Sequence, residues 1–156
     1  MLFRSSRWVQ FWRERRLGYQ LQLARANGHG GRFQVLGEKL LAKLDSFFSE
    51  ANQAASLLHG DLWSGNYSFD SEGQPVLFDP AVYYGDRETD IAMTELFGGF
   101  PAAFYAAYRE SYPIDPGYDV RKNLYNLYHI LNHLNLFGGG YRSQAEQMMG
   151  SLLAET

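Results

Sequence analysis

The chain has 156 residues, of which 46% are hydrophobic and 20% are charged, and its formal net charge is −3 at pH 7. This length and composition predict one folded domain with a substantial core and argue against disorder. The acidic balance argues against nucleic acid as the main partner, and no apolar run approaches the about 18 residues that a membrane-spanning helix needs. The chain has no cysteine, which excludes disulfides and thiolate chemistry, and we expect a cytoplasmic protein.

Two helices are predicted in the first third of the chain. The first is indicated by apolar residues at helical spacing, which are Trp8, Trp12, Tyr19, Leu23 and Ala26. Glycines at positions 28, 30 and 31 are expected to end it. The second helix runs to about Glu50 and is indicated by Phe33, Leu36, Leu40, Leu44 and Phe47.

The pattern then changes to short apolar runs bounded by turn residues, which predict strands at residues 56–59, 66–70 and 75–79. Helical spacing returns after Asp86 and predicts helices at 88–97, 101–111, from about 120 to the glycines at 138–140, and 143–153. The predicted fold class is therefore α+β, mostly helical with one small β insertion.

The runs 66–70 and 75–79 are predicted to pair as a hairpin around the turn at residues 71–74. In this register Asn66 lies directly opposite Asp79, and opposed side chains share one face with Cβ atoms about 5 Å apart. Asp61 lies at the start of the loop that leads into the hairpin. Three oxygen-bearing side chains are therefore expected to gather at the open end of the hairpin.

This set of side chains suits phosphoryl transfer. One carboxylate and one amide can hold Mg²⁺ without neutralising it, so the ion can still bind phosphate oxygens. A second carboxylate can orient a hydroxyl and accept its proton. The alternative is that Asp61 and Asp79 cap turns and Asn66 closes a loop. The spacing His-x-Asp-x-x-x-x-Asn, followed at hairpin distance by an apolar residue and Asp, favours the chemical interpretation.

These motifs carry a resemblance to a known family. His59-Gly60-Asp61 with Asn66 resembles the catalytic loop of the protein-kinase-like superfamily, and Asp79 begins a segment similar to its metal-binding Asp-Phe-Gly. Glycine replaces the arginine typical of regulated protein kinases, a form shared by small-molecule kinases. The strings LLHGDLWSGN, FDPAVYYGDRETDIAM and FWRERRLGYQLQLA most closely resemble the fructosamine kinase (ketosamine-3-kinase) family, and the resemblance covers nearly the whole chain.

The resemblance implies a role for each matched residue. Asp61 would be the catalytic base, and Asn66 and Asp79 would hold Mg²⁺ on the phosphates of ATP. His59 and Asp90 would support the catalytic loop, although Asp90 also reads as an ordinary first-turn helix acid. The substrate would be a small-molecule or protein-bound ketosamine, phosphorylated on its 3-hydroxyl. Side chains that would line the sugar pocket or serve only in packing are Trp63, Tyr83, Tyr84, Arg87 and Glu88.

The resemblance also implies a first lobe with a phosphate-covering loop, a strand lysine and a helix glutamate. Only 58 residues precede His59 and they read as two helices, while Lys39 and Lys43 fall on the second of these. Residues 1–156 are therefore expected to form a single C-terminal lobe of a protein-kinase-like fold. The missing N-terminal lobe would act in cis or in trans, and the isolated chain would have little or no kinase activity.

Other interpretations stay open. The chain could be a non-catalytic remnant that serves as an interaction module, or an aminoglycoside-type phosphotransferase with a different acceptor. His129 and His133 are four apart on the long helix and could share a metal, although buried histidines on a packed helix are the more ordinary case. The glycine clusters follow helices and lack the spacing of a phosphate-binding loop.

Overall fold

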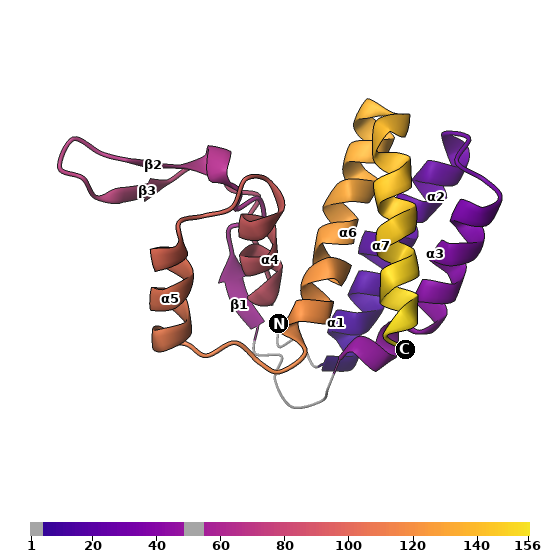
Figure 1. Ribbon diagram of the computed structural model, residues 1–156, viewed down its shortest axis with the longest axis horizontal. Helices are drawn as coiled ribbons and strands as arrows, with labels where there is room; N and C mark the ends of the chain where they lie inside the picture. The colour runs from indigo at the N-terminus through magenta and orange to yellow at the C-terminus, as the bar shows by residue number, and fades with distance from the viewer. Residues whose placement is uncertain (1–4, 49–54) are drawn as a thin grey trace.

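The computed structural model describes residues 5–48 and 55–156. The prediction of a mostly helical α+β fold is confirmed (Figure 1). The helices are α1 (Ser5–Phe11), α2 (Gly18–Ala26), α3 (Arg32–Ala42), α4 (Glu88–Leu96), α5 (Ala102–Ser111), α6 (Tyr118–Phe137) and α7 (Arg142–Ala154). The strands are β1 (Ala55–Leu58), β2 (Tyr67–Phe69), β3 (Pro75–Leu77) and β4 (Tyr83–Asp86). Among the described residues, no helix is both long and apolar enough to span a bilayer.

The long helix α6 is the centre of the molecule. It packs against α4 on one side and against α2 and α7 on the other, and α3 packs against α7 (Figure 1). The strands and α5 lie on the α4 side, and the β2–β3 hairpin projects away from the helices. The core of α6 consists of fully buried apolar side chains at helical spacing, which are Leu124, Leu127, Ile130, Leu131 and Leu134. The helical bundle therefore forms a rigid support for the smaller α4–strand side.

A π-helical segment (Trp12–Leu17) joins α1 to α2 and changes which face is buried. It adds a residue to one turn, so the buried positions continue five residues after Trp12 instead of four. The predicted face does not hold at Tyr19 and Ala26: both are exposed, Tyr19 to 53%, whereas Trp8 and Trp12 are buried. The buried face passes instead through Leu17, Leu21 and Ala24.

The π-helical segment depends on Gly18. Its backbone N–H donates to the carbonyl of Arg13, and a Cβ atom at this position would lie 2.2 Å from that oxygen. We therefore expect Gly18→Ala to lower the free energy of unfolding by about 1–3 kcal/mol, the usual cost of overpacking. Gly150→Ala is the matched control, because nothing lies within 4 Å of its Cβ position in α7; there alanine should stabilise by about 0.5–1 kcal/mol. Urea unfolding measures the free energy of unfolding of both variants. Equal changes would contradict the role of Gly18 in the π turn.

The second helix is shorter than predicted. α3 ends at Ala42, and a 3-10 turn (Leu44–Phe47) continues the buried face with Leu44 and Phe47. The end predicted at Glu50 lies outside the described residues.

β1 pairs with β4 rather than with the hairpin, in antiparallel register from Ala55 opposite Asp86 to Leu58 opposite Tyr83. This pairing was not predicted, because β4 carries no alternation of apolar and polar residues. Because β4 directly precedes α4, this pairing places the start of α4 beside β1, the strand that leads into the loop at residues 59–66.

The hairpin forms, but the predicted register is wrong by one residue. Tyr67 lies opposite Leu77 and Phe69 opposite Pro75. The cause is Asp70, which starts the turn instead of ending the strand: its Oδ1 accepts the N–H groups of Glu72 (2.9 Å) and Gln74 (2.8 Å). A shift of one residue moves a side chain to the other face of the hairpin, so the predicted pairing of Asn66 with Asp79 does not occur.

Candidate active site

The loop that follows β1 is held by a carboxylate from α4. The backbone N–H of His59 donates to Asp90 Oδ2 (2.7 Å), and that of Gly60 donates to Asp90 Oδ1 (2.9 Å). Burial raises the pKa of Asp90, while the two N–H donors and His59 act against this rise and Asp61 adds to it. Asp90 therefore fixes the backbone at the entry to the loop.

Gly60 is required by the local geometry. Its φ is +83°, and a Cβ atom there would lie 2.1 Å from the carbonyl oxygen of Ala81. Only glycine fits both the left-handed conformation and this close approach. An arginine at this position is therefore incompatible with the observed backbone.

His59 connects the loop to the segment after β3. Its Nε2 lies 3.0 Å from the carbonyl oxygen of Phe78, so Nε2 carries the proton. Nδ1 is then free to accept the N–H of Asp61 at 3.3 Å. The carbonyl of His59 also accepts the N–H of Ala81 at 2.7 Å. These contacts fix the orientation of the imidazole and tie residues 59–61 to residues 78–81.

Asp61 and Asn66 are in direct contact. Asn66 is buried, and its Nδ2 donates to the backbone oxygen of Asp61 (2.9 Å) and to Asp61 Oδ2 (3.1 Å). Both acceptors are oxygens, so the amide nitrogen of Asn66 is the atom that faces Asp61. The amide oxygen Oδ1 is not used in these two bonds. These bonds confirm the prediction that the side chains of Asp61 and Asn66 lie together.

Asp79 lies just past the end of the hairpin. The N–H of Phe78 donates to the carbonyl of Asn66 at 3.2 Å, so Asp79 follows directly after the residue bonded to Asn66. Its φ is +52°, and among the described residues it is the only one other than glycine with a positive φ. Such strained conformations concentrate at functional sites. The exposed carboxylate of Asp79 and Asn66 Oδ1 are hard oxygen donors of the kind that Mg²⁺ prefers.

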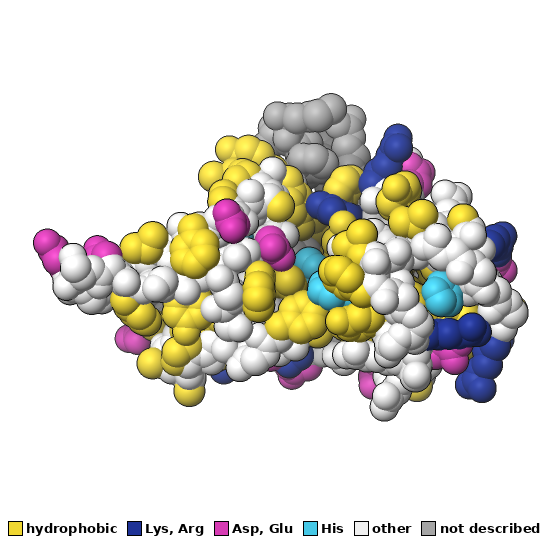
Figure 2. Space-filling model, turned by 90° about the horizontal axis from the view of Figure 1, so that it is seen from above, with side chains coloured by type: hydrophobic (Ala, Val, Ile, Leu, Met, Phe, Trp, Pro, Cys, Tyr) yellow, Lys and Arg dark blue, Asp and Glu magenta, His cyan; other side chains and the backbone are white. Residues whose placement is uncertain are grey.

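A pocket of about 450 Å³ opens beside Asp61. It is built from the loop at residues 59–66, the end of α4, the C-terminal part of α6 and the turn before α7. The side chains that give it its character are Asp61, Trp63, Phe97, His133, Phe137 and Tyr141. Figure 2 shows histidine side chains among hydrophobic ones in the middle of one face of the molecule. Of the residues predicted to bind substrate, Trp63 lines this pocket.

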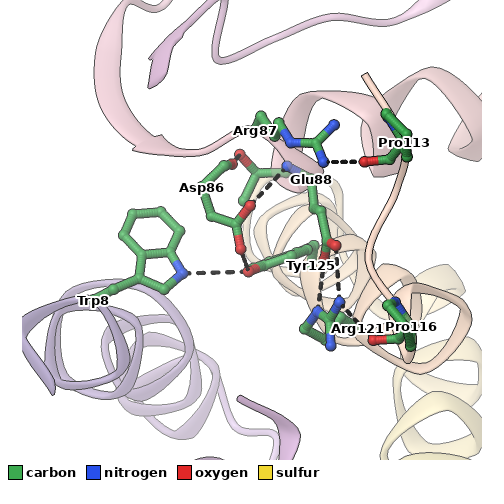
Figure 3. Close-up of polar contacts among 9 residues, drawn as sticks. Trp8, Asp86, Arg87, Glu88, Pro113, Pro116, Arg121 and Tyr125 are labelled. Atoms are coloured by element: carbon green, nitrogen blue, oxygen red, sulfur yellow. Dashed lines mark hydrogen bonds and ion pairs between the residues drawn. The ribbon is translucent and has the colours of Figure 1, made fainter. Parts of the chain in front are cut away.

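Arg87 and Glu88 do not line this pocket, and their contacts are those of the packing alternative. Arg87 donates to Tyr108 Oη (3.1 Å) and to the backbone oxygen of Pro113, and its guanidinium lies over the ring of Tyr112. It anchors α4 to the segment that follows α5 (Figure 3). Of the two remaining candidates, Tyr84 is 59% exposed on β4, and the ring of Tyr83 lies under the guanidinium of Arg16, 4.6 Å from it.

Glu88 is 3% exposed and forms a bidentate ion pair with Arg121 of α6 (2.6 and 2.8 Å; Figure 3). Arg121 also donates to the backbone oxygen of Pro116 at 3.1 Å. Burial raises the pKa of Glu88, whereas the bonds from Arg121 lower it. The pair joins the first turn of α4 to the first turn of α6.

A second buried chain of hydrogen bonds begins at Asp86, whose Oδ2 accepts from Tyr125 Oη at 2.6 Å. Tyr125 in turn accepts from Trp8 Nε1 at 3.3 Å (Figure 3). Burial raises the pKa of Asp86. These bonds join α1, β4 and α6. The network could not be predicted from sequence because its members lie far apart along the chain.

The two histidines of α6 have different surroundings. His133 Nδ1 lies 2.8 Å from the carbonyl of His129, so that Nδ1 is the donor. His133 lines the pocket, with its ring centroid 5.0 Å from that of Phe97 and 5.3 Å from that of Tyr141. Enclosure by protein, with smaller effects of Arg16 and His133, lowers the pKa of His129 to about 3. Among the described residues, no group of three or more histidine, cysteine or acidic side chains could hold a metal ion.

Comparison with solved structures defines the class of protein. A crystal structure of a "putative fructosamine-3-kinase" from Thermobifida fusca superposes with a TM-score of 0.84 at 33% identity, covering 94% of this chain and 51% of that chain. One from Haemophilus somnus gives a TM-score of 0.80 at 34% identity, covering 94% and 49%. The fold is therefore the protein-kinase-like fold of these enzymes.

Sequence comparison then gives the family. The fructosamine kinase family model matches residues 3–155, and this chain belongs to that family. It is 54% identical over 146 residues to a "Probable ketoamine kinase" of Synechocystis, covering 94% of this chain and 48% of the relative. It is 45% identical to "Protein-ribulosamine 3-kinase, chloroplastic" of Arabidopsis thaliana, covering 96% and 45%. The chain thus spans about half the length of the relatives that it matches.

Proposed function

We propose that this chain is the catalytic-loop part of a kinase that transfers the γ-phosphoryl group of ATP to the 3-hydroxyl of a ketosamine. The observation that carries the proposal is the bonded set of Asp61, Asn66, His59 and Asp90. A fixed carboxylate at the mouth of a pocket is what a general base for a hydroxyl nucleophile requires. Because Asp90 and His59 hold the backbone that leads to Asp61 and Asn66 holds its backbone oxygen, its carboxylate does not need to reorganise during the reaction.

Asn66 and Asp79 are the residues that would hold Mg²⁺. Their free oxygens, the strained backbone of Asp79 and the bond from Phe78 to Asn66 support this assignment. When bound, the ion would supply charge neutralisation for the phosphates of ATP. The incomplete neutralisation by one carboxylate and one amide leaves that capacity intact.

A cation that grips the phosphates would come from a segment outside this chain. Lys39 lies on α3, Lys43 directly follows it, and Lys122 pairs with Glu95 at 2.8 Å. The relatives are about twice as long as this chain. We therefore assign ATP binding to the complete protein, with the N-terminal part supplied in cis or in trans.

The experiment compares the chain alone with the chain joined to the N-terminal half of its Synechocystis relative. ATP consumption is measured with a fructosamine, with an aminoglycoside and without acceptor. We expect the joined protein to turn over only with the fructosamine and the chain alone to show little or no activity. Turnover with the aminoglycoside would indicate the other acceptor class. A joined protein that folds, binds ATP and transfers nothing would indicate a non-catalytic interaction module.

A further inference from the structure

The pocket beside Asp61 is lined mainly by aromatic side chains. Its walls are dominated by the rings of Trp63, Phe97, Phe137 and Tyr141. Two of these rings remain open to solvent, since Trp63 is 37% exposed and Phe137 is 70% exposed. Three polar side chains, Asp61, Asn132 and His133, lie among these rings, and in such pockets a few polar groups set the orientation of the ligand.

The charges of the lining point to a cation. Asp61 contributes a carboxylate, and no lysine or arginine is found among the described residues that line the pocket. Aromatic faces carry negative quadrupole potential and attract cations, most strongly where water is partly excluded. A carboxylate and several ring faces therefore favour a positively charged group and disfavour an anionic one.

His133 adds a polar group to the same wall. Its Nδ1 is used as the donor to the carbonyl of His129, so Nε2 is the ring nitrogen left for a ligand. Three rings surround it, with centroid distances of 5.0 Å to Phe97, 5.4 Å to Phe137 and 5.3 Å to Tyr141. Packing of this kind holds the imidazole in one orientation.

We propose that this pocket recognises the amine half of the substrate as a protonated secondary amine, through the ring faces of Trp63 and Phe137 and the imidazole of His133. The inference rests on the proposed function, because a ketosamine is a sugar joined to an amine that carries a proton at neutral pH, as alkylamines do. The positive charge then distinguishes a ketosamine from a free sugar with the same hydroxyl groups. Selectivity for the adduct would come from the amine, and reactivity from the sugar hydroxyl at Asp61.

The test measures binding of two probes to this chain without ATP. The first is 1-deoxy-1-(butylamino)fructose, and the second is the neutral 1-O-butyl ether of fructose, which has the same shape. Fluorescence of Trp63 reports binding, because Trp8 and Trp12 are buried at 2% and 1% exposure. We expect the amine to bind at least about tenfold more tightly than the ether, the equivalent of one or two cation–π contacts.

Phe137→Leu tests the ring contribution. Leucine keeps apolar surface but has no ring, so the Kd of the amine should rise about threefold to tenfold while that of the ether changes little. Phe69→Leu is the matched control, because Phe69 is 60% exposed on the hairpin away from the pocket; it should change neither Kd. Trp63→Phe should abolish the fluorescence change, and NMR titration then supplies the Kd.

Equal affinity for the two probes, no binding of the amine, or an unchanged preference in Phe137→Leu would each overturn the inference. The assay contains no ATP and no N-terminal part, so its outcome is independent of phosphoryl transfer. A selective pocket in a protein that transfers no phosphate would contradict the proposed function alone. If the joined protein phosphorylated both probes while this chain bound them with equal Kd, only the amine recognition would be contradicted.

Discussion

Asp61→Asn should lower kcat for ketosamine phosphorylation about 10²–10⁴-fold in the joined protein, the range that a positioned general base contributes. Asparagine cannot accept the proton of the sugar hydroxyl. It can still accept the hydrogen bond that Asn66 Nδ2 donates to Asp61 Oδ2 at 3.1 Å, so the loop should keep its conformation. The expected result is therefore a loss in kcat with an unchanged free energy of unfolding and an unchanged Kd for ATP.

Asp70→Asn is the matched control for this substitution. Asp70 Oδ1 accepts the N–H groups of Glu72 and Gln74 in the exposed hairpin turn, and an asparagine oxygen can accept the same bonds. Its kcat should stay within about twofold of the parent value, because no proton transfer depends on it. If both variants lost activity to a similar degree, or if Asp61→Asn retained full turnover, Asp61 would not be the base.

The second large effect concerns stability. Arg121→Met should lower the free energy of unfolding by about 3–5 kcal/mol, because it leaves the Glu88 carboxylate buried without its partner. The side chains of this pair are 11% and 4% exposed. Urea unfolding at neutral pH measures the change. If the single variant is too unstable to purify, Glu88→Leu combined with Arg121→Met should recover most of the loss, since neither charge of the pair then remains buried.

Arg25→Met provides the comparison at an exposed pair. Arg25 and Glu38 form an ion pair of the same type, with side chains 60% and 64% exposed. Exposed pairs contribute about 1 kcal/mol or less, so this variant should unfold almost as the parent does. A similar loss in Arg25→Met and Arg121→Met would show that burial does not set the cost.

The catalytic loop could be predicted from sequence because its residues lie close together along the chain. Asp61 and Asn66 are five residues apart, and the structure brings them into contact. The hairpin register could not be predicted with the same accuracy. Asp70 fits both a strand end and a turn start, and only the bonds of its side chain to Glu72 and Gln74 decide between them.

The buried face of the first helical region shows a different limit. A constant helical spacing predicts that Tyr19 shares one face with Trp8 and Trp12, yet Tyr19 is exposed and the two tryptophans are buried. The π turn between Trp12 and Leu17 adds one residue, and its most visible sequence signal is Gly18, which permits the close approach to Arg13. Glycine in a helical pattern has many causes, so the signal is recognisable only once the structure is known.

The pocket was the least predictable part. Trp63 is adjacent to the loop and was a candidate, whereas His133, Phe137 and Tyr141 lie about 70 residues further along the chain. Their only sequence signal was the pair of histidines four apart on one helix, which suggested a metal or a packed core. Conversely, Arg87 and Glu88 are near the site in sequence, but α4 directs them toward α5 and α6.

The most direct test of the account is the position of the phosphate in the product made by the joined protein from ATP and a fructosamine. Two-dimensional ³¹P–¹H NMR identifies the carbon that carries the phosphoester. We expect a single product that carries phosphate on the 3-hydroxyl of the sugar. This product should be absent when Asp61 is replaced by asparagine. Phosphate on another position, or ATP hydrolysis without a sugar phosphate, would contradict the account.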